Sequence, residues 1–281
     1  MPTHPVSFEF FPPRNEEQAL VLRSTWQKLA RLDPRDLTVT VGAGGSAQDA
    51  TLKTVEELLE RADAPVAAHI SCMAPGVAML DDLLDRYRAA GVNRLVVLRG
   101  DPPESLDFEP PFRYANELVG HVRHRHGDHF HIEVGCYPEI HPESPDMASE
   151  IHWFGEKVRA GADGAITQYF FEAETYFRFV EQCREAGVGI PITPGIMPIT
   201  NYTQLARFSA RCGARIPGWL EDRLTGFGDD GAAIRDYGLD VITELCIQLL
   251  EGGAPGLHFY TLNRANATMR IWQRLKSNAL L

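Results

Sequence analysis

The acid Glu9 stands within an apolar stretch near the amino terminus, VSFEFFPP at residues 6–13. The Val and Phe residues predict a short β-strand that the two prolines end. Side chains alternate along a strand, so Glu9 shares a face with Ser7 and Phe11. A carboxylate in such apolar surroundings is costly to bury unless it has a partner or keeps its proton. It is therefore either an edge-strand residue facing water or a general acid at the mouth of a pocket.

Polar residues also lie at or just after the carboxyl ends of the other apolar stretches that predict strands. They are Thr40, His69, Asp101, Tyr137 and Gln168, with Tyr260 and Asn263 at the last strand. Any one of them alone more often has a structural role; a single histidine such as His69, for example, is usually a hydrogen-bonded core residue. The carboxyl ends of barrel strands converge on one face, however, and active sites of that fold lie there. We therefore expect these residues to share a pocket with Glu9.

The elements that must position these residues alternate between strand and helix along the whole chain. Besides the stretch around Glu9, strands are predicted at residues 36–41, 65–71, 94–98, 131–136, 164–168, 190–193 and 256–261. Helices are predicted at 16–32, 49–61, 78–90, 114–124, 147–160, 173–186, 201–212 and 265–275. An irregular insert from Ile216 and a long helix ending near Leu250 precede the last strand. Eight βα units predict an α/β fold, a (β/α)8 barrel with extra helices before the last strand, formed by residues 1–281 as one domain. A doubly wound open sheet is the alternative.

The composition narrows the class of protein. The net charge of −11 argues against nucleic acid or anionic lipid as a partner, although a locally basic site could bind an anionic ligand. No secretory segment opens the sequence and no stretch approaches the length of a membrane span. The five cysteines are scattered and lack a CxxC pair, which favours reduced, mostly buried thiols in a cytoplasmic protein.

Two motifs have weaker interpretations. The stretch GAGGSA at residues 42–47 fits a dinucleotide-binding pattern, but the next strand carries His69 instead of the acid that a Rossmann site needs. A ligand loop that donates backbone N–H groups is the better interpretation. The histidines His121, His124, His126, His129 and His131 precede a strand and so lie opposite the expected pocket; a solvated helix end is favoured over a metal site. No zinc-site spacing or nucleophile motif is present.

Six segments together resemble the methylenetetrahydrofolate reductase family. They are SFEFFPP at 7–13, LRGD at 98–101, YPE and HPE at 137–143, ITQYFF at 166–171, PGIMPI at 194–199 and HFYTLNR at 258–264. The resemblance covers nearly the whole chain and departs from the family pattern at Val41, at Gly135-Cys136 and at Glu150. It implies a barrel that binds FAD and reduces 5,10-methylenetetrahydrofolate to 5-methyltetrahydrofolate with NADH or NADPH, in one-carbon metabolism and methionine biosynthesis. Hydride would pass through FAD in a ping-pong sequence.

The resemblance also implies roles for individual residues. Glu9 would be the general acid that opens the folate ring to an iminium, with Asp101 near flavin and pterin and Gln168 in contact with the pterin. The residues implied for flavin binding are Thr40, His69, Arg99, Gly100, Asp101, Tyr114, Tyr137, His141, Glu150 and Lys157. Those implied for folate binding are Glu9, Gln168, Gln204, Phe208 and Arg264. No metal is expected.

Two other functions stay open at this point. One is a flavin-independent reductase that passes hydride directly from nicotinamide to folate. The other is a folate- or flavin-binding barrel that has no catalytic activity. Without the resemblance, the acidic residues in a barrel pocket would suggest a lyase. The family often forms homo-oligomers. Because the sequence ends at Leu281, we expect no domain for control by S-adenosylmethionine.

Overall fold

The computed structural model describes residues 4–41, 45–101 and 108–281. Its strands are β1 (Val6–Phe10), β2 (Asp36–Val39), β3 (Val66–Ser71), β4 (Arg94–Leu98), β5 (His131–Cys136), β6 (Gly164–Thr167), β7 (Ile192–Thr193), β8 (Gly195–Ile196) and β9 (Leu257–Tyr260). Its α-helices are α1 (Glu16–Leu29), α2 (Gly45–Arg61), α3 (Val77–Ala89), α4 (Ala115–His126), α5 (Met147–Arg159), α6 (Ala173–Glu185), α7 (Tyr202–Cys212), α8 (Gly218–Gly226), α9 (Gly231–Glu251) and α10 (Ala265–Ser277).

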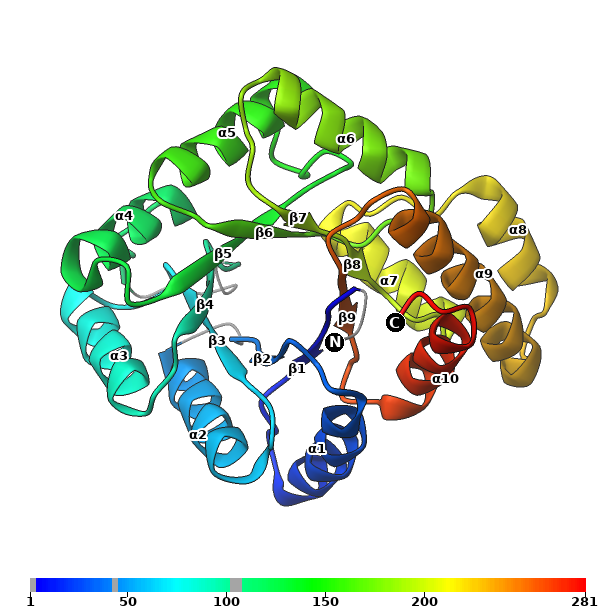
Figure 1. Ribbon diagram of the computed structural model, residues 1–281, viewed down its shortest axis with the longest axis horizontal. Coiled ribbons are helices and arrows are strands. Elements are labelled where there is room, and N and C mark those ends of the chain that lie inside the picture. The colour runs from blue at the N-terminus through cyan, green and yellow to red at the C-terminus, as the bar shows by residue number, and fades with distance from the viewer. Residues whose placement is uncertain (1–3, 42–44, 102–107) are drawn as a thin grey trace. The chain divides into compact units, whose positions relative to one another are not determined.

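The strands form one sheet in the order β7-β6-β5-β4-β3-β2-β1-β9-β8. The two ends of this order, β7 and β8, follow each other in the chain with only Pro194 between them. Proline has no N–H to donate to a ladder, which explains the interruption. Counting β7 and β8 as halves of one strand gives eight strands whose order returns to its start. The predicted (β/α)8 class is confirmed, and Figure 1 shows the alternating elements.

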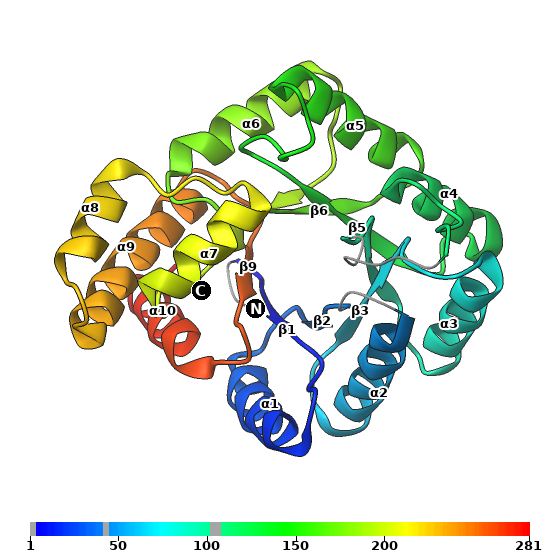
Figure 2. The same ribbon diagram turned by 180° about the vertical axis from the view of Figure 1, so that it is seen from behind.

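Most predicted elements are confirmed within a residue or two, and one prediction is wrong. The insert expected to be irregular from Ile216 contains α8, which begins at Gly218 after Pro217 and buries Leu220 and Leu224. These two leucines are four residues apart and therefore lie on one helix face. The extra helices before the last strand are thus α8 and α9, and Figure 2 shows them beside α10.

The described chain groups into two compact units. Unit 1 comprises the described residues up to Val6, Cys136–Gly155 and Ile166–Leu281. Unit 2 comprises the described residues of Ser7–Gly135 and Glu156–Ala165. In unit 1, α9 contacts both α6 and α10, and β8 pairs with β9.

The strands of unit 2 have one apolar and one polar face. The parallel register pairs Glu9 with Thr38, Thr38 with Ala67, His69 with Val96, and Val96 with Glu133. Because side chains alternate along each strand, these residues share a face. The other face carries the buried side chains of Phe8, Phe10, Leu37, Val39, Ala68, Ile70, Leu95, Val97, Ile132 and Val134. The helices α1 to α4 flank the strands (Figure 1); α2 contacts β2 and β3, and α4 contacts β4.

Candidate active site

Glu9 and His69 come together on the polar face of unit 2. Glu9 is 7% exposed and its Oε2 lies 3.5 Å from Nε2 of His69, which is also buried. β1 and β3 hold them, two strands apart, and all five β1 residues are buried. The edge-strand alternative for Glu9 is therefore wrong, because β1 pairs on both sides, with β2 and β9. A buried carboxyl beside an imidazole can hold and release a proton without contact with bulk water.

The segment after β4 packs closely on the end of β3. Gly100 has φ +79°, and a Cβ there would lie 3.0 Å from Ser71 Cβ and from Met73 Cγ. The N–H of Cys72 donates to the carbonyl oxygens of both Leu98 and Arg99 at 3.1 Å. Only glycine adopts this backbone conformation without strain in so little space. The result is a fixed turn that carries Arg99 half-buried and Asp101 exposed.

Three other residues predicted for unit 2 lie at the ends of their elements. Thr40 follows β2, and its N–H donates to Phe10 O at 2.9 Å. Tyr114 is the N-cap of α4 and is exposed. Lys157 on α5 donates from Nζ to Gly135 O at 2.8 Å. That bond uses one of three ammonium protons and places a cation beside the end of β5.

In unit 1, residues that follow β5 form a second group. The rings of Tyr137 and His141 meet edge to face with centroids 4.6 Å apart. His141 Nδ1 accepts a hydrogen bond from the N–H of Glu143 at 3.1 Å, so its neutral form carries the proton on Nε2. Glu150 on α5 is buried and accepts from the Ser144 hydroxyl at 2.7 Å. This bond holds the loop before α5 against the helix.

The residues predicted for folate binding in unit 1 are carried by three elements. Gln168 follows β6, its N–H donates to Cys136 O at 2.8 Å, and its Oε1 accepts from the N–H of Tyr169 at 3.1 Å. Gln204 and Phe208 lie one turn apart on α7 and are half-buried. Arg264 is the N-cap of α10 and is exposed. Three different elements thus supply an amide, an aromatic ring and a cation.

Two polar contacts in unit 1 were not predicted from the sequence. The Tyr169 hydroxyl lies 3.0 Å from Ser209 Oγ, and Cys212 Sγ donates to it at 3.4 Å. The Tyr260 hydroxyl donates to Thr167 O at 2.8 Å across Gly195, where a Cβ would lie 2.2 Å from that oxygen. The glycine in the PGIMPI segment was the available signal for the second contact. Nothing local signalled the first.

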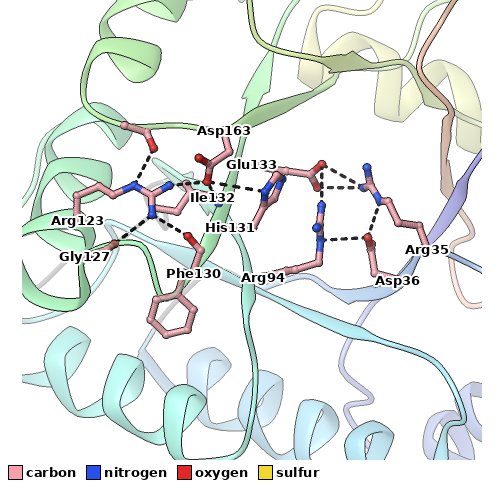
Figure 3. Close-up of polar contacts among 11 residues, drawn as sticks. Arg35, Asp36, Arg94, Arg123, Gly127, Phe130, His131, Ile132, Glu133 and Asp163 are labelled. Atoms are coloured by element: carbon pink, nitrogen blue, oxygen red, sulfur yellow. Dashed lines mark hydrogen bonds and ion pairs between the residues drawn. The ribbon is translucent and has the colours of Figure 1, made fainter.

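The amino ends of the unit 2 strands hold a buried ion cluster (Arg35, Asp36, Arg94 and Glu133) that was not predicted from the sequence either. Arg35 contacts Asp36 at 2.7 Å and Glu133 at 3.1 Å, and Arg94 contacts them at 3.3 and 3.6 Å (Figure 3). Burial opposes the charge of Arg35, but the two carboxylates raise its pKa above the ordinary value. Glu133 within the apolar stretch HIEVGC was the available signal. The cluster lies at the strand ends opposite Glu9 and His69.

The histidine cluster is only in part the solvated helix end that the sequence predicted: His124 is exposed, but the other four histidines are not. His126 is buried, and burial lowers its pKa. His121 contacts Asp81 of α3 at 2.7 Å, and His129 contacts Val92 O at 3.2 Å. His131 lies 3.9 Å from Asp163, which Arg123 also contacts (Figure 3). Apart from His124, the histidines join α3, α4 and the start of β5.

Neither a metal-binding cluster nor a membrane-spanning helix occurs in the described part of the chain. No group of three or more His, Cys, Asp or Glu in residues 4–41, 45–101 and 108–281 could hold a metal ion. Within these same ranges, no helix has the length and apolar character to cross a membrane. All five cysteines are free, and four of them are buried. The predicted ligand loop at 42–47 lies partly outside the described residues, and its last part begins α2 at Gly45.

The model of the methylenetetrahydrofolate reductase family matches residues 3–276. The chain belongs to this family. The 5,10-methylenetetrahydrofolate reductase of Escherichia coli K12 is 35% identical over 270 residues, which is 96% of this chain and 90% of that protein. Methylenetetrahydrofolate reductase (NADH) 1 of Arabidopsis thaliana is 36% identical over 282 residues. The chain spans about half the length of that plant relative, 48%.

A solved structure with a similar fold supports the fold described for this chain. It is an uncharacterized protein from Clostridium thermocellum that binds two copies of 5-methyl-5,6,7,8-tetrahydrofolic acid. The TM-score is 0.66 at 16% identity, and the match covers 98% of this chain and 95% of the other. At this identity the likeness concerns the fold alone.

Proposed function

We propose that the chain is a flavin-dependent methylenetetrahydrofolate reductase that reduces 5,10-methylenetetrahydrofolate to 5-methyltetrahydrofolate. The observation that carries the proposal is the buried contact of 3.5 Å between Glu9 and His69, in a chain of this family. NADH, the coenzyme in the name of the plant relative, is the expected hydride donor. We extend the proposal to the residues that each substrate contacts.

The donor set of the chain fits FAD. Arg99 and Lys157 are cations suited to a pyrophosphate in an otherwise acidic protein. The close approach of Gly100 to Ser71 gives a backbone surface that a flat ring can lie against. The remaining proposed contacts are Thr40, His69, Asp101, Tyr114, Tyr137, His141 and Glu150. When bound, FAD supplies the two-electron carrier between nicotinamide and folate.

Glu9 is the proposed general acid of the folate half-reaction. It gives a proton to the folate amine nitrogen as the bond from that nitrogen to the bridging carbon breaks, leaving an iminium that can accept hydride. Burial disfavours the ionised carboxyl, and His69 at 3.5 Å can share the proton that Glu9 must hold before reaction. After release, the pair takes up another proton before the next turnover.

The other proposed residues bind and orient the folate. The charge of Asp101 stabilises the positive iminium, since a fixed carboxylate favours a developing cation. Phe208 stacks on an aromatic ring, Arg264 binds a carboxylate or the pterin edge, and Gln168 and Gln204 offer amide hydrogen bonds. Of these residues, Gln168 is the one that directly follows a strand, β6.

The test is the separate measurement of two half-reactions in Glu9→Gln. We expect normal reduction of the bound flavin by NADH and a loss of at least about 100-fold in its reoxidation by 5,10-methylenetetrahydrofolate. The matched control is Glu133→Gln, which removes another buried carboxylate from the same sheet face and should keep both half-reactions. Retention of folate reduction by Glu9→Gln would contradict the acid role. Turnover without flavin absorption bands in the wild type would instead indicate direct hydride transfer.

A further inference from the structure

We propose that Tyr169 is a positioning residue that fixes both the Gln168 amide and helix α7 for folate binding. The inference rests on the proposed function, and it adds a residue to which neither the family resemblance nor the proposed substrate contacts give a role. Its basis is that one residue bonds in two directions, through its backbone N–H and through its hydroxyl. Both bonds lie within unit 1.

The hydroxyl contact links the end of β6 to α7. Tyr169 and Ser209 are both buried, with their oxygens 3.0 Å apart. Burial raises the pKa of Tyr169, so the hydroxyl keeps its proton at physiological pH. Cys212 donates its S–H to the Tyr169 oxygen, and the Tyr169 O–H can then donate to Ser209 Oγ. Two residues one turn apart on α7 thus bond to a single oxygen.

The residues proposed to bind folate lie on the same helix, beside the face that Tyr169 holds. Leu205 and Ser209 form the buried face of α7. Gln204 and Phe208 each precede one of them by one position and are half-buried, so they lie about 100° around the helix. Any rotation or slide of α7 on its buried face therefore moves Gln204 and Phe208 together. The Tyr169 bonds restrict that movement.

The backbone contact sets which atoms Gln168 offers to a ligand. Its Oε1 accepts from the N–H of Tyr169 at 3.1 Å, and only the carbonyl oxygen of the amide can accept from an N–H. Oε1 keeps a second lone pair, and the other end of the amide is the NH2 group, which we take as the contact for a ligand. It donates, so the ligand atom that it recognises is an acceptor, such as a carbonyl oxygen or an unprotonated ring nitrogen.

Aromatic packing holds Tyr169 in place. Its ring meets Phe171 and Tyr260 edge to face, with centroids 5.9 and 6.3 Å away. Tyr260 is itself bonded to Thr167 O of β6 at 2.8 Å. Edge-to-face pairs of this kind add to the stability of buried rings. The packing of Phe171 and Tyr260 against the ring thus keeps the Tyr169 hydroxyl directed at α7.

The experiment compares Tyr169→Phe with Tyr176→Phe. Tyr176 is a matched control because it is also buried in unit 1 and its hydroxyl donates to Ile192 O of β7 at 2.8 Å, away from α7. For Tyr169→Phe we expect the KM for 5,10-methylenetetrahydrofolate to rise at least about fivefold, because the hydrogen bonds of the hydroxyl to Ser209 and Cys212 are lost, with flavin reduction by NADH unchanged. Amide hydrogen exchange within α7 should also become faster. Tyr176→Phe should change neither property.

A second variant separates positioning from general loss of stability. Tyr169→Phe removes the bonds to Ser209 and Cys212, whereas Ser209→Ala removes only the first, so Ser209→Ala should give smaller effects in the same direction. The double variant should be no worse than Tyr169→Phe, because the hydroxyl that Ser209 contacts is then already absent. Equal effects of Tyr169→Phe and Tyr176→Phe on KM and on α7 exchange would overturn the inference. Failure of the wild type to transfer hydride to folate would refute the proposed function instead. The α7 exchange measurement still decides whether Tyr169 holds the helix.

Discussion

The buried ion cluster predicts a large and specific loss of stability in Glu133→Gln. Gln keeps the size of Glu and can still accept a hydrogen bond, but it removes one of two negative charges. Arg35 at 3.1 Å and Arg94 at 3.6 Å would then share Asp36 alone. The cluster changes from neutral to a net charge of +1 where both carboxylates are buried.

The magnitude follows from the exposure of the four groups. Removing one partner of a fully buried ion pair costs about 3–5 kcal/mol, because the other charge stays buried without compensation. The Arg35 and Arg94 side chains are 26% and 21% exposed, against 0% and 4% for Asp36 and Glu133. Water therefore screens part of the excess positive charge. We expect a loss of about 2–3 kcal/mol in the free energy of unfolding.

Urea unfolding followed by circular dichroism is the assay. With a slope of about 3 kcal/mol per molar urea, the midpoint should fall by about 0.8 M. Glu16→Gln is the control, because the Glu16 side chain is 79% exposed and also lies near an arginine, Arg23, at 3.2 Å. Its midpoint should not change measurably. If Glu133→Gln unfolded at the same urea concentration as Glu16→Gln, the cluster would contribute nothing and the reasoning from burial would be wrong.

Two further predictions concern buried titratable groups. Burial raises the pKa of Cys72 and Cys183 to about 12 and also raises that of Cys246, so at about pH 8 only the half-buried Cys212 should react quickly with a thiol reagent. All five should react after unfolding, and two or more fast thiols in the native protein would contradict this. Burial lowers the pKa of His126, with Asp85 opposing and Arg125 and Arg88 adding to the shift, so the folded state binds that proton less readily than the unfolded chain. The contribution of His126 to the free energy of unfolding should be fully present above about pH 6.5 and should decrease below it. Between about pH 7 and 5.5, His126→Gln should therefore lose less stability than the wild type. An equal loss in both proteins would refute the role of His126.

The strands were predicted well because their signals are local. β4 and β5 begin and end at the predicted residues, where apolar runs meet polar or turn residues. α8 was missed because Pro217, Gly218 and Gly226 suggest a loop, although its two buried leucines have helical spacing. A helix of nine residues between such breakers depends on packing as much as on propensity.

In the candidate site, too, the features with local signals were predicted and the long-range contacts were not. The position of Glu9 in a buried strand followed from its apolar neighbours, and its closeness to His69 from the rule that parallel strands end together. The bond between Tyr169 and Ser209 joins residues 40 apart, and the ion cluster joins β2, β4 and β5. Such contacts need the strand register and the side-chain directions, which no local pattern contains.

The two ends of the polar face of unit 2 are proposed to have different roles, stability at the amino ends of the strands and proton transfer near the carboxyl ends. The charges of the residues explain the difference. The ion cluster has two cations and two anions, so its net field at Glu9 is small and its loss should change stability more than proton affinity. Glu9 and His69 are the pair proposed to hold the proton near the carboxyl ends, and no large loss of folding energy is expected when Gln replaces the acid. Glu133→Gln should therefore lower the urea midpoint and keep the folate half-reaction. Glu9→Gln should instead keep the urea midpoint and lose the folate half-reaction. If each variant lost both properties, the two ends would have to be one coupled network, and the separate roles of Glu9 in proton transfer and of Glu133 in stability would fall together.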